Sequence, residues 1–302
     1  MAASATWART PFRLPRPEAA VNRIALLLAA GFALLSAGCA GRAEEKDPIV
    51  ARVEMATRDE KAQRAMAALL SSCGGYEVWQ GMREAEYRYR FQFFGGDPQP
   101  RLVRVQKHWL SLDDEVHLRM QDLEGADPIE ARLDLDKVAL LRAGQPFDDP
   151  SQSEFQRAFG RQVRWEFLTP WTFLQSGILL ESRGVRTPPT AGKVPPGPCD
   201  VIRVRFERPM EGGGTDDWHD VYISGRSHLV EEIVTYRSSA NQYRLSVWSD
   251  HRDFDGLRVA TRRETYASDE AATVGPLQAV AEYSDIRFTR RDAAEPTPSA
   301  AR

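Results

Sequence analysis

The chain has 302 residues, a length that suffices for one sizeable domain. Its formal net charge is −3. The segment before Cys39 holds four arginines and one glutamate, so the remainder carries a net charge of about −6. That acidic balance leaves no basic footprint for nucleic acid, and no nucleic-acid partner is expected. After Cys39, no apolar run is long enough to cross a bilayer as a helix.

The first 38 residues have the pattern of an export signal. Four arginines precede a short apolar stretch, residues 24–35, and small residues follow it. A transmembrane helix needs roughly 20 apolar residues, whereas a basic, a short apolar and a small-residue segment in this order are typical of a signal peptide. We therefore predict that residues 1–38 are a signal peptide.

Cys39 closes this segment as the last residue of the run Leu35-Ser36-Ala37-Gly38-Cys39. The run resembles the lipobox of bacterial lipoproteins, in which the chain is cut before the cysteine and the thiol is acylated. The resemblance implies attachment to a membrane through acylated Cys39. Ala40 in the next position favours the outer membrane, with the protein facing the periplasm. The alternatives are an ordinary secretory leader, or an uncleaved anchor with an incidental cysteine.

The rest of the chain is expected to form one domain between two irregular ends. Residues 39–56 are expected to be the lipidated cysteine and a tether, and residues 57–290 the domain. Residues 291–302 are rich in Ala, Pro and Ser. Such a composition buries too little apolar surface to order a segment, so we predict a disordered tail.

The domain is expected to begin with a helix. Thr57 and Glu60 have the spacing of a capping box, which satisfies free backbone N–H groups at a helix start. Apolar residues then recur at the helical period. Gly74-Gly75 is expected to end the helix, since glycine readily adopts the left-handed cap conformation.

From Glu84 onward the apolar period changes to two, which predicts a half-buried strand. The inner face of this strand is strongly aromatic and carries Tyr87, Tyr89, Phe91 and Phe93. Further alternating segments follow it and are separated only by turns. Strands connected in this way pair antiparallel, because parallel pairing needs long crossovers.

The alternation stops at Asp149-Pro150-Ser151, where a second helix is expected. Proline suits the first helical position, and Glu154 would complete another capping box. An apolar stretch follows the helix, so residues of about 150–175 are expected to form a helical plug. Its aromatic residues are Phe155, Phe159, Trp165, Phe167, Trp171 and Phe173.

Alternation resumes after the plug and brings the expected total to roughly ten or eleven strands, too many for a small sandwich. The predicted fold class is therefore mainly β (α+β). We expect a curved antiparallel sheet, or an incompletely closed β-barrel, with helices over the concave face.

Three short motifs connect this order of elements to a known group. They are Gly74-Gly75-Tyr76-Glu77-Val78-Trp79, Phe167-Leu168-Thr169-Pro170-Trp171 and Phe254-Asp255-Gly256-Leu257. With a leading helix, antiparallel strands and a mid-chain helical segment, the chain resembles the LolA/LolB-like exported lipoproteins, in an uncharacterised LolA-like branch. The resemblance implies a LolA-like domain and a carrier of lipids or of lipoprotein acyl chains. In that branch the last motif continues with Leu-Pro, whereas this chain has Arg258-Val259.

Residue types that carry catalysis are present without the required spacing. The chain has no Gly-x-Ser-x-Gly elbow, and its histidines lack the spacing of a helical zinc site. His219 and His228 could face each other across a hairpin, but a solvated strand pair is the expectation. We predict no enzyme, no metal and no cofactor. A pair of distant carboxylates remains open, because their separation cannot be read from sequence.

Two cysteines follow Cys39, and their state is open. Cys73 and Cys199 could form a disulfide that closes a long loop in an oxidising compartment. They could equally be two separate buried thiols that act as small apolar side chains. The choice depends on the distance between their Cα atoms.

The aromatic residues of the first strand and of the plug are the remaining functional signal. As an ensemble they could line an apolar cleft that takes a lipid or acyl chain without covalent change. These candidate ligand-binding residues are Tyr87, Tyr89, Phe91, Phe93, Phe155, Phe159, Trp165, Phe167, Trp171 and Phe173. The alternative is a packed core in a structural or protein-interaction lipoprotein of the cell envelope.

Overall fold

A single antiparallel sheet dominates the computed structural model, which describes Val53 and residues 57–112, 117–125, 128–134, 137–175, 177–189, 197–207 and 216–291. The predicted signal peptide, Cys39, most of the tether and nearly all of the tail lie outside these residues. The described residues belong to one compact unit, Lys46–Arg302.

The sheet has 13 strands, and every neighbouring pair is antiparallel. Its order ends at β6 and β7 with no pairing between these two strands, so the barrel is not closed. In sheet order the strands are β6 (Gln145–Phe147), β5 (Lys137–Arg142), β4 (Ile129–Asp134), β3 (His117–Asp122), β2 (Leu102–Ser111), β1 (Met82–Phe93), β13 (Leu277–Arg290), β12 (Leu257–Ser268), β11 (Gln242–Phe254), β10 (Val230–Arg237), β9 (Trp218–Ser224), β8 (Cys199–Phe206) and β7 (Ile178–Arg186).

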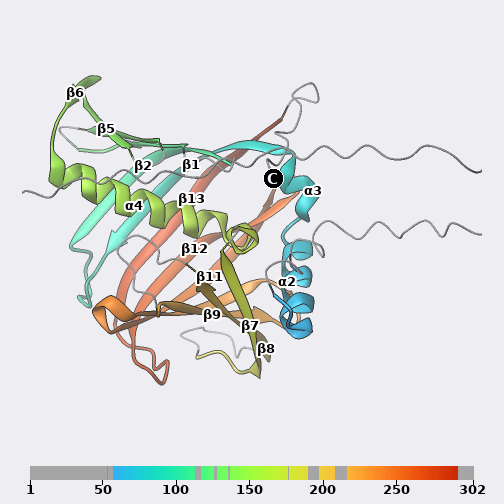
Figure 1. The fold of residues 1–302 in the computed structure, drawn as a ribbon. Coiled ribbons are helices and arrows are strands. Elements are labelled where there is room, and N and C mark those ends of the chain that lie inside the picture. The colour runs from blue at the N-terminus through green and yellow to red at the C-terminus, as the bar shows by residue number, and fades with distance from the viewer. Residues whose placement is uncertain are drawn as a thin grey trace, which may run out of the picture. The chain divides into compact units, whose positions relative to one another are not determined.

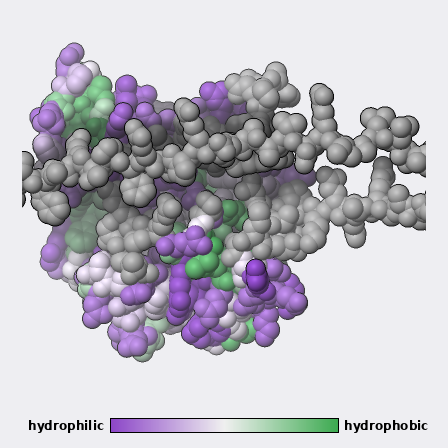
Figure 2. Space-filling model, in the orientation of Figure 1, coloured by the Kyte–Doolittle hydropathy of each residue, from purple (hydrophilic) through white to green (hydrophobic). Residues whose placement is uncertain are grey.

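The predicted fold class is confirmed, although the strand count is higher than expected. The long mid-chain helix, α4 (Pro150–Leu168), crosses the concave side of the curved sheet (Figure 1). The other helices with bounds inside the described ranges are α2 (Glu60–Ser72), α3 (Tyr76–Gln80), η1 (Trp171–Leu174) and η2 (Ser238–Ala240). On the face seen in Figure 2, hydrophilic side chains surround smaller areas of apolar surface.

The N-terminal cap of α2 differs from the expected capping box. Asp59 is the cap: its Oδ1 accepts from the backbone N–H groups of Lys61 at 2.9 Å and Ala62 at 3.2 Å. Thr57 is buried and instead donates its hydroxyl to the carbonyl of Leu180 at 2.7 Å. The other Asp59 oxygen accepts from Ser182 N–H at 2.9 Å, a bond that lowers the pKa of Asp59. Thr57 and Asp59 thus attach the start of α2 to β7.

Helix α4 begins at the predicted place, with Asp149 as cap and Pro150 at the first position. The expected capping box with Glu154 is wrong, because Gln152 occupies the third helical position. Asp149 Oδ1 accepts from Gln152 N–H at 3.0 Å. Midway along the helix, Gly160 allows a close approach to β3 and β4: a Cβ atom there would lie 2.6 Å from Leu133 Cδ2. The absent side chain therefore sets how near α4 lies to this half of the sheet.

The three sequence motifs meet in the structure. Gly74 packs against Gly256 so closely that a Cβ on Gly74 would lie 2.1 Å from the Gly256 carbonyl oxygen. Trp79 and Trp171 stack with ring centroids 5.1 Å apart and planes at 9°. The motifs therefore join α2, α3, η1 and the β11–β12 turn, and their role in this chain is structural.

Candidate functional site

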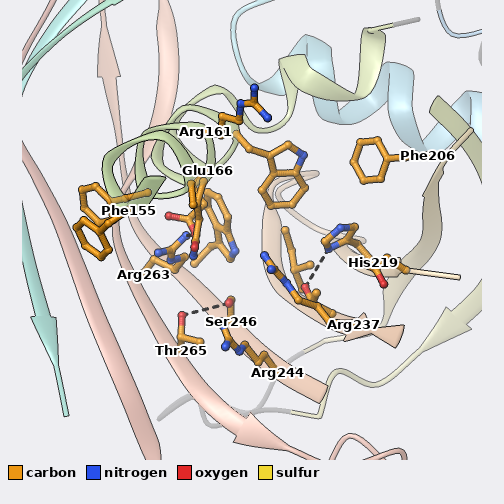
Figure 3. Close-up of a pocket in the computed structure, with 18 residues that line it drawn as sticks. Phe155, Arg161, Glu166, Phe206, His219, Arg237, Arg244, Ser246, Arg263 and Thr265 are labelled. Carbon is orange, nitrogen blue, oxygen red and sulfur yellow. Dashed lines mark hydrogen bonds and ion pairs between the residues drawn. The ribbon is translucent and has the colours of Figure 1, made fainter. Parts of the chain in front are cut away.

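A cavity of about 290 Å³ lies between α4 and strands β9 to β12 (Figure 3). Its volume is near the lower end of the roughly 300–1,000 Å³ that is usual for ligand pockets. The lining residues come from α4, from β8 to β12 and from the segment before β9: Phe155, Ala158, Phe159, Arg161, Gln162, Trp165, Glu166, Phe206, Asp217, His219, Ile233, Thr235, Arg237, Arg244, Ser246, Trp248, Arg263 and Thr265.

One side of the cavity is aromatic. Phe155, Phe159 and Trp165 project from α4, and Phe206 from β8 faces them across the opening. Phe155 and Phe159 are four residues apart, so they lie on one face of the helix and stack with centroids 5.7 Å apart. Phe155 is 45% exposed, which places it at the mouth of the cavity.

The opposite side is polar and is built by strand register. His219 on β9, Thr235 on β10 and Arg244 on β11 are aligned across the sheet. Ile233 and Arg237 share the face of Thr235 because side chains two apart on a strand point the same way. On the next strands Ser246 is paired with Thr265, and their hydroxyl oxygens are 3.3 Å apart.

A buried ion pair connects the two sides. Glu166 on α4 and Arg263 on β12 are 5% and 4% exposed and contact each other directly. Gln162 Nε2 donates to Glu166 Oε1 at 2.8 Å. Glu166 Oε2 and Arg263 Nε are buried without a hydrogen-bond partner among the described residues, as are the indole nitrogens of Trp165 and Trp248. Native proteins leave few buried polar atoms unsatisfied, so this region is unusual.

His219 differs from the expectation of a solvated strand pair. It is buried, and its Nδ1 lies 2.9 Å from Thr235 Oγ1. Its expected neighbour His228 lies in the turn after β9, with φ of 55°. Burial lowers the pKa of His219 to about 4, and the nearby charge of Arg237 adds to this effect. The imidazole is therefore neutral at neutral pH.

Three of the ten predicted aromatic residues line the cavity: Phe155, Phe159 and Trp165. Phe91 lies next to it and meets Phe159 edge to face at 6.0 Å. Five others pack in the core, namely Tyr87, Tyr89, Phe167, Trp171 and Phe173. Tyr87 stacks on Phe167 at 4.1 Å because the later part of α4 rests directly on β1. Phe93, at the end of β1, is 39% exposed.

The charged residues of the cavity were missed by sequence reasoning. Arg237, Arg244 and Arg263 lie on strands. Side chains of a strand alternate between its two faces, and the sequence alone does not show whether an arginine's face points to the cavity or to solvent. The only available signal was the position of Arg237 and Thr235 in phase with Ile233 on β10. Which face of that strand is buried depends on α4, which is distant in sequence.

Cys73 and Cys199 are free buried thiols, so the predicted possible disulfide is not formed. Cys73 is the C-cap of α2 and belongs to the main core, whereas Cys199 at the start of β8 belongs to a separate smaller cluster. Burial is the main cause that raises the pKa of each thiol to about 12.

The described ranges contain no group of three or more His, Cys, Asp or Glu side chains that could hold a metal ion. No helix within them has the length and apolar character needed to cross a membrane.

A second buried histidine gives the protein a predicted pH dependence. His108 on β2 is fully buried, with Nε2 donating to Gln106 Oε1 at 2.9 Å and Nδ1 3.3 Å from the Tyr87 hydroxyl. Burial lowers its pKa from 6.5 to about 3. Because the folded-state pKa is depressed, the stabilisation is complete above the unfolded value and is lost as pH falls towards the folded one.

We expect the free energy of unfolding to fall on acidification, by about 2 kcal/mol at pH 5 for each of His108 and His219. In His108→Gln this acid-induced loss should be smaller by about 2 kcal/mol, whatever the stability of the variant at neutral pH. Urea unfolding at neutral pH and at pH 5 measures the difference, with the exposed His117→Gln as control. An unchanged acid-induced loss in His108→Gln would contradict a neutral buried imidazole.

Comparison with known proteins gives similarity only at the level of solved structures. No family model matches the sequence, and no curated protein is significantly similar to it. A DUF1329 family protein from Desulfovibrio piger has a TM-score of 0.45 and 10% identity, over 83% of this chain and 95% of that one.

Two further similar structures are described as a lipoprotein-sorting domain and as a LolA superfamily protein. A domain described as an outer membrane lipoprotein-sorting protein, from Vibrio parahaemolyticus, has a TM-score of 0.46 and 9% identity over 76% of this chain and 91% of that one. A LolA superfamily protein from Nitrosomonas europaea has a TM-score of 0.45 and 10% identity, over 76% and 94%. At this level of similarity, function has to be inferred from the residues of the cavity itself.

Proposed function

We propose that this protein binds a hydrophobic ligand, a lipid or an acyl chain, without covalent change in the cavity beneath α4. The observation that carries the proposal is the aromatic side of the cavity, where Phe155, Phe159, Trp165 and Phe206 surround a space that the core does not fill. Transfer of hydrocarbon from water to such a surface contributes roughly 25 cal/mol per Å².

The predicted signal peptide and the resemblance of residues 35–39 to a lipobox complete the proposal. Acylated Cys39 would attach the protein to the outer membrane, with the domain in the periplasm. Several buried acyl chains give stable anchoring, since each buried methylene contributes about 0.8 kcal/mol. In this setting the domain would meet lipids at the membrane to which it is attached.

Binding of the neutral fluorescent probe N-phenylnaphthylamine to the full chain tests the cavity. We expect saturable binding to the wild type and roughly tenfold weaker binding to Phe155→Glu, because a charge at the mouth replaces apolar contact area. Phe155 is 45% exposed, so the substitution spares the core.

Leu179→Glu is the matched control, since Leu179 on β7 is 49% exposed and lies outside the cavity lining. Its probe affinity should equal that of the wild type. No probe binding to the wild type would contradict the proposal and would favour the alternative, an envelope interaction protein without a ligand.

A further inference from the structure

Two arginines on the strand side of the cavity have no counter-charge. Of the two carboxylates in the lining, Glu166 contacts Arg263, and Asp217 Oδ1 accepts from the backbone and hydroxyl of Ser238 at 2.7 and 2.8 Å. Within the described part of the chain, Arg237 and Arg244 form no ion pair and no side-chain hydrogen bond.

These two guanidinium groups are close enough to repel each other. Desolvation, followed by the charge of Arg237, lowers the pKa of Arg244. An arginine remains protonated despite such a shift, so the strand side of the cavity holds two positive charges without a counter-charge among the described residues. Arg244 is exposed by its accessible surface, so an anion between the two groups would act mainly by removing their repulsion.

The surroundings of the arginines favour an anion as well. Neutral His219 adds no charge. The hydroxyls of Ser246 and Thr265 lie on the same side and share one hydrogen bond, which leaves one of the two O–H groups free to donate. Arginine donates two parallel hydrogen bonds to carboxylate and phosphate oxygens, and such charge-assisted bonds are about twice as strong as neutral ones.

Both sides of the cavity are mixed, with Arg161, Gln162 and Glu166 on α4 and Ile233 and Trp248 on the strands. The two arginines without a counter-charge nevertheless lie on the strands, and the stacked Phe155–Phe159 pair lies on α4. Figure 3 shows Arg237 and Arg244 on the strand side and Phe155 on α4 across the cavity. A hydrocarbon chain fits the aromatic side and an anionic group the strand side. A free inorganic anion would leave the aromatic side unoccupied.

We propose that the ligand is an anionic amphiphile whose carboxylate or phosphate head group is bound by Arg237 and Arg244, with its hydrocarbon chain against the α4 aromatic residues. This inference rests on the proposed function and adds the chemical class of the ligand. The head group selects among lipids, while the aromatic side supplies non-specific affinity.

Displacement of N-phenylnaphthylamine from the full chain by palmitate, hexadecanol and inorganic phosphate tests the inference, with both amphiphiles kept below their aggregation thresholds. Palmitate and hexadecanol share a chain and differ in the charge of the head group. We expect palmitate to bind at least about tenfold more tightly than hexadecanol, as two charge-assisted contacts allow. Inorganic phosphate alone should not displace the probe.

The variant Arg237→Gln/Arg244→Gln should lose the preference for palmitate and keep its affinity for hexadecanol and the probe. Arg252→Gln, on β11 but outside the lining, is the control and should keep the preference.

Equal affinity of the wild type for both amphiphiles, or a preference for palmitate that survives in the double variant, would overturn the proposed anionic head group and leave the proposed apolar site intact. Displacement of the probe by phosphate as effective as that by palmitate would instead identify a free-anion site. Failure of the wild type to bind the probe and both amphiphiles would overturn the proposed function itself.

Discussion

The substitution Gly74→Ala is expected to lower the free energy of unfolding by about 3–5 kcal/mol, as the sum of backbone strain and a steric clash. Gly74 has φ of 111°, which L-residues rarely adopt. A Cβ there would lie 2.1 Å from the backbone oxygen of Gly256, which cannot move as a flexible side chain would. The Arg258 N–H donates to the Cys73 carbonyl at 3.1 Å and holds the two segments at this distance.

Gly75→Ala is the matched control. Gly75 also has a positive φ, 83°, but a Cβ there would meet nothing within 4 Å. This variant should therefore lose only the backbone contribution, about 1–3 kcal/mol. Chemical denaturation of both variants measures the difference. Equal losses would show that the contact between α2 and the β11–β12 turn does not restrict the fold.

Removal of one partner of the buried ion pair should have an effect of similar size. Glu166→Ala leaves Arg263 charged and buried without a carboxylate, and such changes cost about 3–5 kcal/mol. Because Glu166 lies on α4 and Arg263 on β12, the loss should be accompanied by easier opening of the helix. Hydrogen exchange of the α4 amides, compared with those of β1, measures that opening.

The double variant Glu166→Leu/Arg263→Met separates charge from packing. It fills the same space without charges, and replacement of a buried pair by apolar residues is often neutral or stabilising. We expect it to recover most of the stability lost in Glu166→Ala, the more so because Glu166 Oε2 and Arg263 Nε are unsatisfied in the wild type. A double variant as unstable as Glu166→Ala would show that the loss comes from packing.

Local patterns in the sequence predicted most elements of the fold, although the sheet has more strands than expected. Alternation over β1 and the Asp149-Pro150 start of α4 predicted a strand and a helix where the structure has them. The hairpin expected near His219 and His228 is formed by β9 and β10. The cap of α2 was assigned to Thr57 because the competing bond of its hydroxyl, to Leu180, spans 123 positions and leaves no local pattern.

The site was only partly predictable. The sequence shows which residues are aromatic, but it does not show whether each ring is buried in the core or borders the cavity. Helical spacing placed Phe155 and Phe159 on one face, and both line the cavity. The same reasoning grouped Tyr87 and Phe167 with them, but these rings stack in the core. An aromatic pattern does not distinguish a ring that contacts another ring from one that borders a cavity, because that depends on how far α4 stands from each strand.

Diffraction from crystals of the full chain grown with palmitate that carries bromine at its chain terminus locates the ligand directly. We predict an anomalous bromine peak beside Phe155, Phe159 and Trp165, with the carboxylate at Arg237 and Arg244. Saturable binding with the bromine elsewhere on the protein, and this cavity without ligand density, would contradict a lipid site beneath α4.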